Sequence, residues 1–326
     1  MRIGYFLSSE EWGPHDLIAQ AIKAREAGFE SLWISDHFHP WNNAQAHSPF
    51  VWSTIGALSQ AVPGMHVTTA VTCPTVRIHP AVIAQAAATS AVLLHGNFSL
   101  GVGTGEALNE RVLGDSWPDA PERREMLDEA VTVIRKLWRG GIQSHQGKHY
   151  TVKHAQIYDL PARQPKIIVS GFGPRSVELA ARIGDGFASV GPDADAVAQF
   201  RERSGDPQRP VQGGLKVCWS ESEDHAVETA HRLWANESLP GELAQILPTP
   251  EHFEQANQLV TKQAVAEDTP CGPDLDAHLE AIAKYRDAGF DELYINQIGP
   301  EQDAFFDVYA KEVLPTVRAW GEPALH

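Results

Sequence analysis

The segment Ser35-Asp36-His37-Phe38-His39-Pro40-Trp41 gathers side chains that could do chemistry. It directly follows residues 31–34, whose apolar character predicts a short buried strand. A histidine side chain, here His37, can take or give a proton under physiological conditions. A carboxylate and an indole flank it, in Asp36 and Trp41. We interpret the segment as a site that handles a proton or a hydride beside a flat cofactor. The plainer alternative is a capping aspartate followed by a loop histidine.

Two glycine-rich segments follow other expected strands. Residues 101–106, Gly-Val-Gly-Thr-Gly-Glu, would let a backbone approach a ligand closely and would present Glu106 to it. They lack the spacing of a dinucleotide fingerprint. Residues 170–175, Ser-Gly-Phe-Gly-Pro-Arg, open a helix, where free N–H groups and the Arg175 charge favour an anion such as phosphate. For both segments the alternative is a tight turn between a strand and a helix.

A third strand end, residues 69–74, could form a wall against a ring, and it contains Cys73. A lone cysteine is also commonly a small buried hydrophobic residue. The remaining histidines have no spacing typical of metal ligands, so no metal site is expected.

Composition narrows the class of protein. The chain has 326 residues and a net charge of -16, which argues against nucleic acid or an anionic membrane surface as a partner and favours a small-molecule substrate. Its three cysteines form no CxxC pair, which is typical of a reducing compartment. No apolar run approaches the ~18 residues of a membrane span. We therefore expect a cytoplasmic protein.

Strand and helix patterns alternate along the chain and predict where these segments sit. The expected strands are Arg2–Leu7, Ser31–Ser35, His66–Thr72, Phe98–Val102, Lys166–Ser170, Gly186–Val190, Val211–Trp219 and Glu292–Gln297. The expected helices are Asp16–Glu26, Pro49–Ala61, Pro80–Leu94, Glu122–Trp138, Pro174–Ile183, Ala194–Arg203, His225–Trp234, Asp276–Arg286 and Ala304–Val317.

Eight strands that are nearly all followed by a helix predict a parallel (β/α)8 TIM barrel, an α/β fold whose active site lies at the carboxyl ends of the strands. No linker divides residues 1–326, so a single domain is expected. Two segments break the pattern and are interpreted as loop insertions. Residues 142–158 read as a β-hairpin, and residues 236–270 as a lid or substrate wall.

These motifs together resemble the luciferase-like flavin and deazaflavin barrels, and most of all the F420-dependent glucose-6-phosphate dehydrogenase family. The matching segments are 35–41, 71–75, 79–85, 101–110 and 181–187. The resemblance is strong from residue 2 to about residue 190 and looser beyond. It implies an F420-dependent oxidoreductase that moves a hydride between a substrate alcohol, or the corresponding carbonyl, and the deazaflavin. By analogy with the family, a homodimer is expected.

The resemblance also implies a role for each matching residue. His37 would take or share the proton of a substrate hydroxyl, Glu106 would act as the acid near N1 of the ring, Trp41 would pack by the reacting carbon, and Glu10 would line the substrate pocket as part of the catalytic group. The cofactor would be held by Asp36, by a cis peptide bond between Ala70 and Val71, and by Cys73, Val102, Gly103, Asn109, Ser170, Gly171, Phe172 and Gly173.

Departures from the family concern the substrate. The basic residues that clamp a sugar phosphate fall near Asp193, Gln255 and Asp268, none of which is basic, although Lys262 lies nearby in sequence. We therefore expect glucose 6-phosphate to be a poor substrate and a neutral alcohol to fit better.

Other departures concern the cofactor site. Cys73 stands where the family has a threonine, and Phe172 alters the shape of the loop that would bind the cofactor's phosphate. Arg175, Arg77 and Lys166 are the candidates for local positive charge beside the anionic cofactor.

Two alternatives remain open. The chain could be an FMN-dependent monooxygenase of the same superfamily, or a flavin-binding barrel without catalytic activity.

Overall fold

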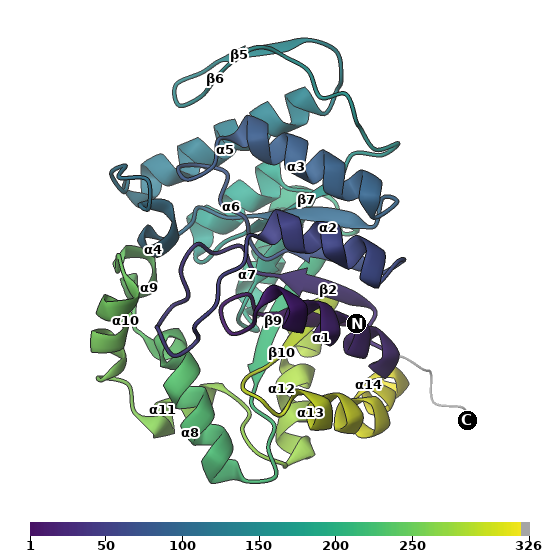
Figure 1. The fold of residues 1–326 in the computed structure, drawn as a ribbon, viewed down its shortest axis with the longest axis vertical. Helices are drawn as coiled ribbons and strands as arrows, with labels where there is room; N and C mark the ends of the chain where they lie inside the picture. The colour runs from purple at the N-terminus through teal and green to yellow at the C-terminus, as the bar shows by residue number, and fades with distance from the viewer. Residues whose placement is uncertain (321–326) are drawn as a thin grey trace.

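Eight parallel strands close into a barrel in the computed structural model, which describes residues 1–320 (Figure 1). Neighbouring strands follow the order β1-β10-β9-β8-β7-β4-β3-β2. This confirms the predicted (β/α)8 barrel. Residues 321–326, the end of the span expected for the domain, lie outside the described residues. The barrel strands are β1 (Arg2–Leu7), β2 (Ser31–Ile34), β3 (His66–Thr69), β4 (Phe98–Val102), β7 (Lys166–Ser170), β8 (Gly186–Ser189), β9 (Val211–Val217) and β10 (Glu292–Gln297).

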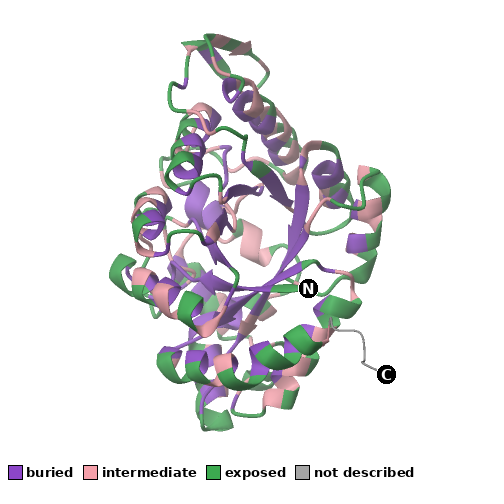
Figure 2. Ribbon diagram, turned by 90° about the vertical axis from the view of Figure 1, so that its right-hand side faces the viewer, coloured by how far each residue is buried: buried purple, intermediate pink, exposed green. Residues whose placement is uncertain are grey.

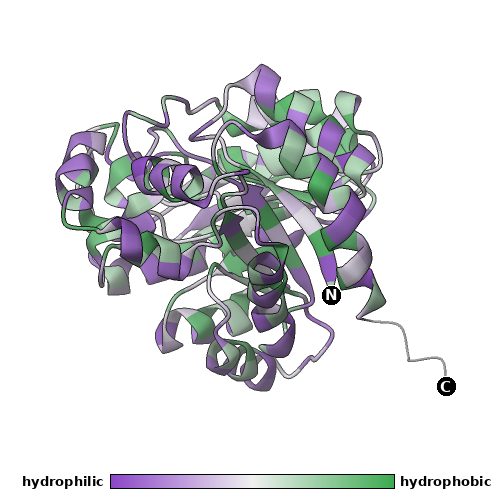
Figure 3. Cartoon of the chain, turned by 90° about the horizontal axis from the view of Figure 1, so that it is seen from below, coloured by the Kyte–Doolittle hydropathy of each residue, from purple (hydrophilic) through white to green (hydrophobic). Residues whose placement is uncertain are grey.

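Helices surround the barrel, and most of them follow a strand directly. The helices that follow the strands are α1 (Pro14–Ala27), α2 (Val51–Ala61), α3 (Pro80–Leu93), α4 (Ala107–Glu110), α5 (Ala120–Leu137), α6 (Pro174–Ile183), α7 (Ala194–Ser204), α8 (Glu223–Trp234), α12 (Leu275–Asp287), α13 (Gln302–Val308) and α14 (Leu314–Ala319). Figure 3 shows hydrophilic and hydrophobic residues together on these surrounding helices, as expected for helices with one face against the sheet. Among residues 1–320, no helix is both long and apolar enough to cross a membrane.

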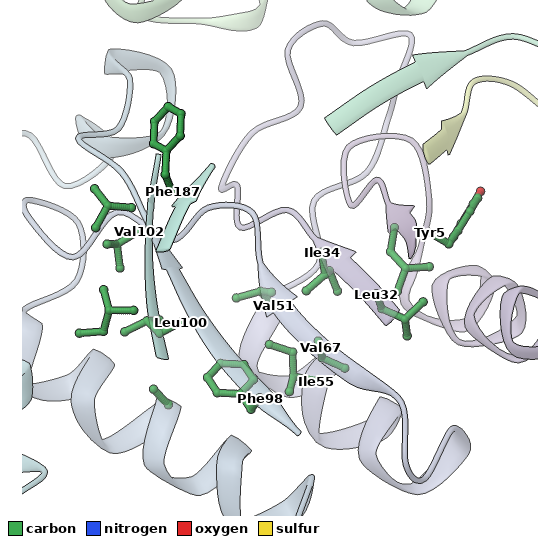
Figure 4. Close-up of a cluster of buried hydrophobic side chains, with 14 of the residues drawn as sticks. Tyr5, Leu32, Ile34, Val51, Ile55, Val67, Phe98, Leu100, Val102 and Phe187 are labelled. Atoms are coloured by element: carbon green, nitrogen blue, oxygen red, sulfur yellow. The ribbon is translucent and has the colours of Figure 1, made fainter. Parts of the chain in front are cut away.

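Alternate residues of each strand divide between two cores. One set packs outward against the helices, where Val51 and Ile55 of α2 lie among Ile34, Val67 and Phe98 (Figure 4). The strands themselves are almost entirely buried (Figure 2). The other set fills the barrel interior as a separate apolar cluster.

Two large rings fill the middle of the interior. Trp33 stacks on Tyr294 with ring centroids 4.5 Å apart. A Cβ at Gly4 would meet the Tyr294 ring at 2.4 Å, and one at Gly214 would meet the Trp33 ring at 2.8 Å. Small residues on neighbouring strands therefore make room for large ones, so the barrel is a packed core and ligands must bind at its ends.

Several boundaries differ from the sequence predictions. The expected third strand ends at Thr69 rather than Thr72, because the Thr69 hydroxyl donates to the Gly101 carbonyl at 2.8 Å and accepts from the Gly101 N–H at 3.0 Å. Pairing resumes only as an isolated bridge between Thr72 and Val102. The short helix α4 was not expected. The predicted closing helix is divided by the π-helical segment Tyr309–Val313, called η2.

Both insertions have regular structure. Residues 142–158 contain the expected hairpin, with β5 (Gln143–Gln146) antiparallel to β6 (Thr151–Ala155), and it projects beyond α5 in Figure 1. Residues 236–270 contain most of a 3₁₀ segment, η1 (Ala235–Ser238), and three short helices. The three helices are α9 (Leu243–Ile246), α10 (Pro250–Asn257) and α11 (Lys262–Asp268). In Figure 1, α11 lies beside α8, whereas α9 lies next to α4.

Gly101 has no room for a larger side chain, which predicts that its substitution destabilises the fold. A Cβ built there would lie 1.7 Å from the Thr69 carbonyl oxygen, which is backbone and has little room to move. We expect Gly101→Ala to lower the free energy of unfolding by about 3 kcal/mol, at the upper end of typical overpacking costs. Urea denaturation would measure it. The matched control is Gly56→Ala, because Gly56 lies within α2 with nothing within 4 Å of a built Cβ. That variant should gain about 0.5–1 kcal/mol. Equal stability of the two variants would contradict this account of β3 and β4.

Candidate active site

The sequence-predicted residues gather at the carboxyl ends of five barrel strands. Glu10 follows β1, the segment 36–41 follows β2, Ala70–Cys73 follows β3, Gly103–Asn109 follows β4 and the segment 170–173 lies at the end of β7. Parallel strands bring these ends to one side of the barrel, which is where active sites of this fold are built. The structure therefore places the predicted residues around one region.

His37 lies between two carboxyl groups. Its Nε2 is 3.5 Å from Oε1 of Glu10 and 3.6 Å from Oε1 of Glu106. On the other side of the ring, Nδ1 lies 3.3 Å from the His39 carbonyl oxygen. A carbonyl only accepts hydrogen bonds, so this contact suits a proton on Nδ1, and Nε2 is the ring nitrogen that faces the two carboxyl groups. Two flanking carboxylates stabilise the imidazolium that forms when Nε2 gains a proton.

Glu10 is buried, and two hydrogen bonds fix one of its carboxylate oxygens. The hydroxyls of Ser8 and Ser35 both donate to its Oε2, at 2.9 and 2.8 Å. This leaves Oε1 directed to His37. The serines were not identified from the sequence, although Ser35 belongs to the segment that drew attention first.

Asn109 connects the loop after β2 to the loop after β4. Its side-chain N–H donates to Oε1 of Glu106 at 2.5 Å, and its Oδ1 accepts from the backbone N–H groups of Phe38 and His39 at 2.8 and 2.9 Å. The family resemblance implied a cofactor contact for Asn109. In the structure its amide fixes the loop that carries His37 against the loop that carries Glu106.

Asp36 is buried in an ion network. Its Oδ1 accepts from Nη2 of Arg77 at 2.9 Å, and its Oδ2 accepts from the Thr72 hydroxyl at 2.8 Å. Arg77 also reaches Glu110, through its backbone N–H at 2.8 Å and Nε at 3.5 Å. Burial raises the pKa of Glu110, while Arg77 opposes that rise. Burial by itself would lower the pKa of Arg77, but Asp36 and Glu110 raise it above its ordinary value. Arg77 is therefore committed to these carboxylates and is not a free charge for an anionic cofactor.

Trp41 is held by the second insertion. Its ring lies 5.0 Å from the His37 ring and 5.1 Å from the ring of Phe253, both in edge-to-face contact. Phe253 is fully buried on α10. The Trp41 backbone N–H donates to Gln45, which in turn donates to the Leu233 carbonyl at the end of α8. Sequence reasoning did not identify Phe253, because the contact spans more than 200 residues.

Small residues form a cradle beside this cluster. The peptide bond between Ala70 and Val71 is cis, as the family resemblance implied. A Cβ at Gly103 would lie 2.7 Å from Cγ2 of Val71, so only glycine lets the two loops approach this closely. The Val102 side chain packs in the outer core, which leaves its backbone for any ligand contact. Cys73 is buried 2.9 Å from the Thr75 hydroxyl, and burial raises the pKa of its thiol, so it is neutral.

Residues 170–173, the loop predicted to bind an anion, lead directly into the N-terminus of a helix. Gly173 has a φ of 77°, and Pro174 then begins the ten-residue helix α6. Arg175 and Phe172 are exposed. Lys166 was wrong as a candidate charge for this end, because it is the first residue of β7 and lies at the opposite end of the barrel. There it lines a surface hollow with Arg135 and Arg209.

The residues at or near the positions expected for a phosphate clamp are engaged in other contacts. Asp193 caps α7 by accepting from the Ala196 N–H at 2.9 Å. Asp268 accepts from the Ser238 hydroxyl at 3.1 Å. Lys262 forms a surface ion pair with Glu228. None of these supplies a free cation.

Comparison with known proteins places the chain among relatives. Residues 1–292 match the family model described as luciferase-like monooxygenase. F420-dependent glucose-6-phosphate dehydrogenases from Microbacterium testaceum and Amycolatopsis mediterranei are 37% and 33% identical over 98% of this chain, and they are covered over 98% and 100% of their own length.

Solved structures agree in fold. An F420-dependent secondary alcohol dehydrogenase in complex with an F420-acetone adduct has a TM-score of 0.91 at 31% identity, over 97% of this chain and 99% of that one. The F420-dependent tetrahydromethanopterin reductase of Methanopyrus kandleri has a TM-score of 0.78 at 18% identity, with the same coverage of both chains, which shows the shared fold. The chain therefore belongs to the luciferase-like monooxygenase family of barrels, within the group that contains the F420-dependent glucose-6-phosphate dehydrogenases.

Proposed function

We propose that this protein is an F420-dependent oxidoreductase that transfers a hydride between a substrate alcohol, or the corresponding carbonyl, and the deazaflavin. The observation that carries the proposal is the placement of Nε2 of His37 between Glu10 and Glu106, at 3.5 and 3.6 Å. Relatives with this cofactor in their names match along nearly the whole chain. When bound, F420 supplies the carbon that accepts or gives the hydride.

The cradle fits a flat, anionic cofactor. Gly101 and Gly103 let the strand β4 and the loop after it pack closely against Thr69 and Val71, which gives this side of the cluster a smooth wall of backbone and small side chains. We propose that these residues and the Val102 backbone hold the ring. The loop from Ser170 to Gly173 then holds a phosphate, with the N-terminus of α6 and Arg175 favouring its charge.

The proposed chemistry of the chain is acid–base catalysis. Nε2 of His37 takes the proton of a substrate hydroxyl, and Glu10 and Glu106 stabilise the imidazolium. Trp41 packs against the His37 ring and restricts the position of the alcohol. Glu106, through its partner Asn109, stays within reach of both His37 and the ring site.

Glucose 6-phosphate is proposed to be a poor substrate. A phosphate dianion needs a cation or a bidentate arginine. The clamp positions hold Asp193, Gln255 and Asp268, and Lys262 is already paired with Glu228. By family analogy and composition, we also propose that residues 1–326 form one domain and that the protein is a cytoplasmic homodimer.

Cofactor binding tests the proposal directly. Titration of the purified protein with F420 and with FMN, followed by fluorescence, should show tight binding of F420 and weak binding of FMN. Tight FMN binding without F420 binding would favour the alternative of a monooxygenase. Binding of F420 without turnover across a panel of alcohols and carbonyls would favour a barrel without catalytic activity.

His37 tests the acid–base role. We expect His37→Ala to lower kcat by about 10²–10⁴-fold, the usual contribution of a general base, while the Kd for F420 changes little. Loss of F420 absorbance with an alcohol substrate measures the rate. His39→Ala is the matched control, because His39 contacts the Leu108 carbonyl rather than a carboxylate. Unchanged turnover by His37→Ala would remove the proposed base.

Phe253 tests whether the insertion positions Trp41. Phe253→Ala should lower kcat by about tenfold to a hundredfold, since misplacement by about 1 Å costs this much, with a smaller change in the Kd for F420. Phe253→Leu keeps most of the volume and should restore much of the rate. Leu259→Ala is the control in the same insertion, because Leu259 is 84% exposed. If Phe253→Ala and Leu259→Ala have the same kcat, the ring contact does not position Trp41.

A further inference from the structure

Lys216 is a cation inside the barrel that the proposed chemistry does not use. Gln212 and Gly214 both meet the interior residue Trp33, so alternation places Lys216 on the interior side as well. Its position near the end of β9 brings it to the same end of the barrel as the candidate site. Its ammonium lies 5.6 Å from the centroid of the Phe6 ring, which belongs to the interior cluster. It was not singled out from the sequence.

Lys216 also lies on the same side as Trp41 and Glu10. Its ammonium lies 4.2 Å from the centroid of the Trp234 ring, and the Trp234 N–H donates to Glu11, the residue after Glu10. Trp234 belongs to the apolar cluster that Trp41 packs against. This is the side where the substrate would meet His37, away from the cofactor cradle on β3, β4 and β7.

The charge of Lys216 is already balanced. Its ammonium pairs with Glu237 in η1, and only 10% of the Lys216 side chain is exposed. Glu11 adds a second carboxyl group nearby; burial raises its pKa to about 7, and Lys216 acts against that rise. Asn296, the register partner of Lys216 on β10, is a neutral amide that donates to the Phe6 carbonyl. Lys216 therefore offers a substrate no uncompensated positive charge.

We propose that Glu237 is a specificity-determining residue, which pairs with Lys216, an interior cation of the substrate side, and thereby restricts the enzyme to alcohols and carbonyls without an anionic group. Glu237 is held beside Lys216 by the fold, so a substrate carboxylate competes against a carboxylate at high effective concentration. Such a substrate also meets the repulsion of Glu237 itself. Removal of the Glu237 charge exposes Lys216 and admits hydroxy acids. The inference rests on the proposed function, because it assigns the substrate class of that same site.

The test compares butan-2-ol with 3-hydroxybutanoate, in which a carboxylate replaces one terminal methyl group. The measured quantity is the ratio of kcat/KM for the acid to kcat/KM for the alcohol, with F420 as acceptor. We expect a ratio well below one in the wild type and at least a tenfold rise in Glu237→Gln, mainly through KM. Adding Lys216→Met to that variant should reverse the rise. Glu267→Gln is the control, because Glu267 is an exposed carboxylate of the same insertion that pairs with Gln263 on its own helix.

A wild-type ratio of one or more, or an unchanged ratio in Glu237→Gln, would overturn the assignment. Calorimetric titration of both compounds, with and without F420, gives a readout that does not need turnover. Binding of 3-hydroxybutanoate to Glu237→Gln alone, lost again with Lys216→Met, supports the role of Glu237 even if no variant transfers a hydride. Equal binding by all variants, or none by any, contradicts it. Absence of turnover with the binding pattern intact contradicts only the proposed oxidoreductase activity.

Discussion

The geometry of the candidate site depends on one buried cation. Arg77, from the loop after β3, lies between Asp36 of the loop after β2 and Glu110 of the helix after β4, and its side chain is only 6% exposed. Charges taken out of water are stable only when they are paired, and removing one partner of such a pair costs about 3–5 kcal/mol. The three loops are therefore held as one unit. Because His37 follows Asp36 directly and Glu106 lies one helical turn before Glu110, the ion network also sets the spacing between His37 and Glu106.

The two sides of the site are built differently. The proposed cofactor side uses backbone and small residues, and its precision comes from the strand register and from close contacts such as Gly103 against Val71. The proposed substrate side uses large side chains held by a segment far along the chain, with Phe253 against Trp41 and Glu237 against Lys216. Family members can therefore share a cofactor cradle while their insertions vary.

Much of this arrangement could be predicted from local sequence patterns. Strand runs and the glycines at 101, 103 and 171 mark where the loops begin, and the segment around His37 carries its own chemistry. The failures arise where a partner distant in sequence decides the outcome. Arg77 reads as a free charge until Asp36 and Glu110 are seen around it, and Lys166 reads as part of the site until the strand direction places it at the other end. For Lys216 a signal was present, since period-2 alternation from Gln212 through Gly214 places it inside. The effect of Glu237 on it is visible only in three dimensions.

The net negative charge of the chain limits which groups could attract an anionic cofactor. Arg77 and Lys216, two partly or fully buried cations at this end of the barrel, are both neutralised by carboxylates of the chain itself. Attraction for a phosphate must then come from groups that carry no compensating partner. Backbone N–H groups at the start of α6 meet this need, because their partial positive charge comes from the helix and no side-chain carboxylate cancels it. A protein with a net charge of -16 can in this way hold an anion locally, through oriented dipoles and the exposed charge of Arg175.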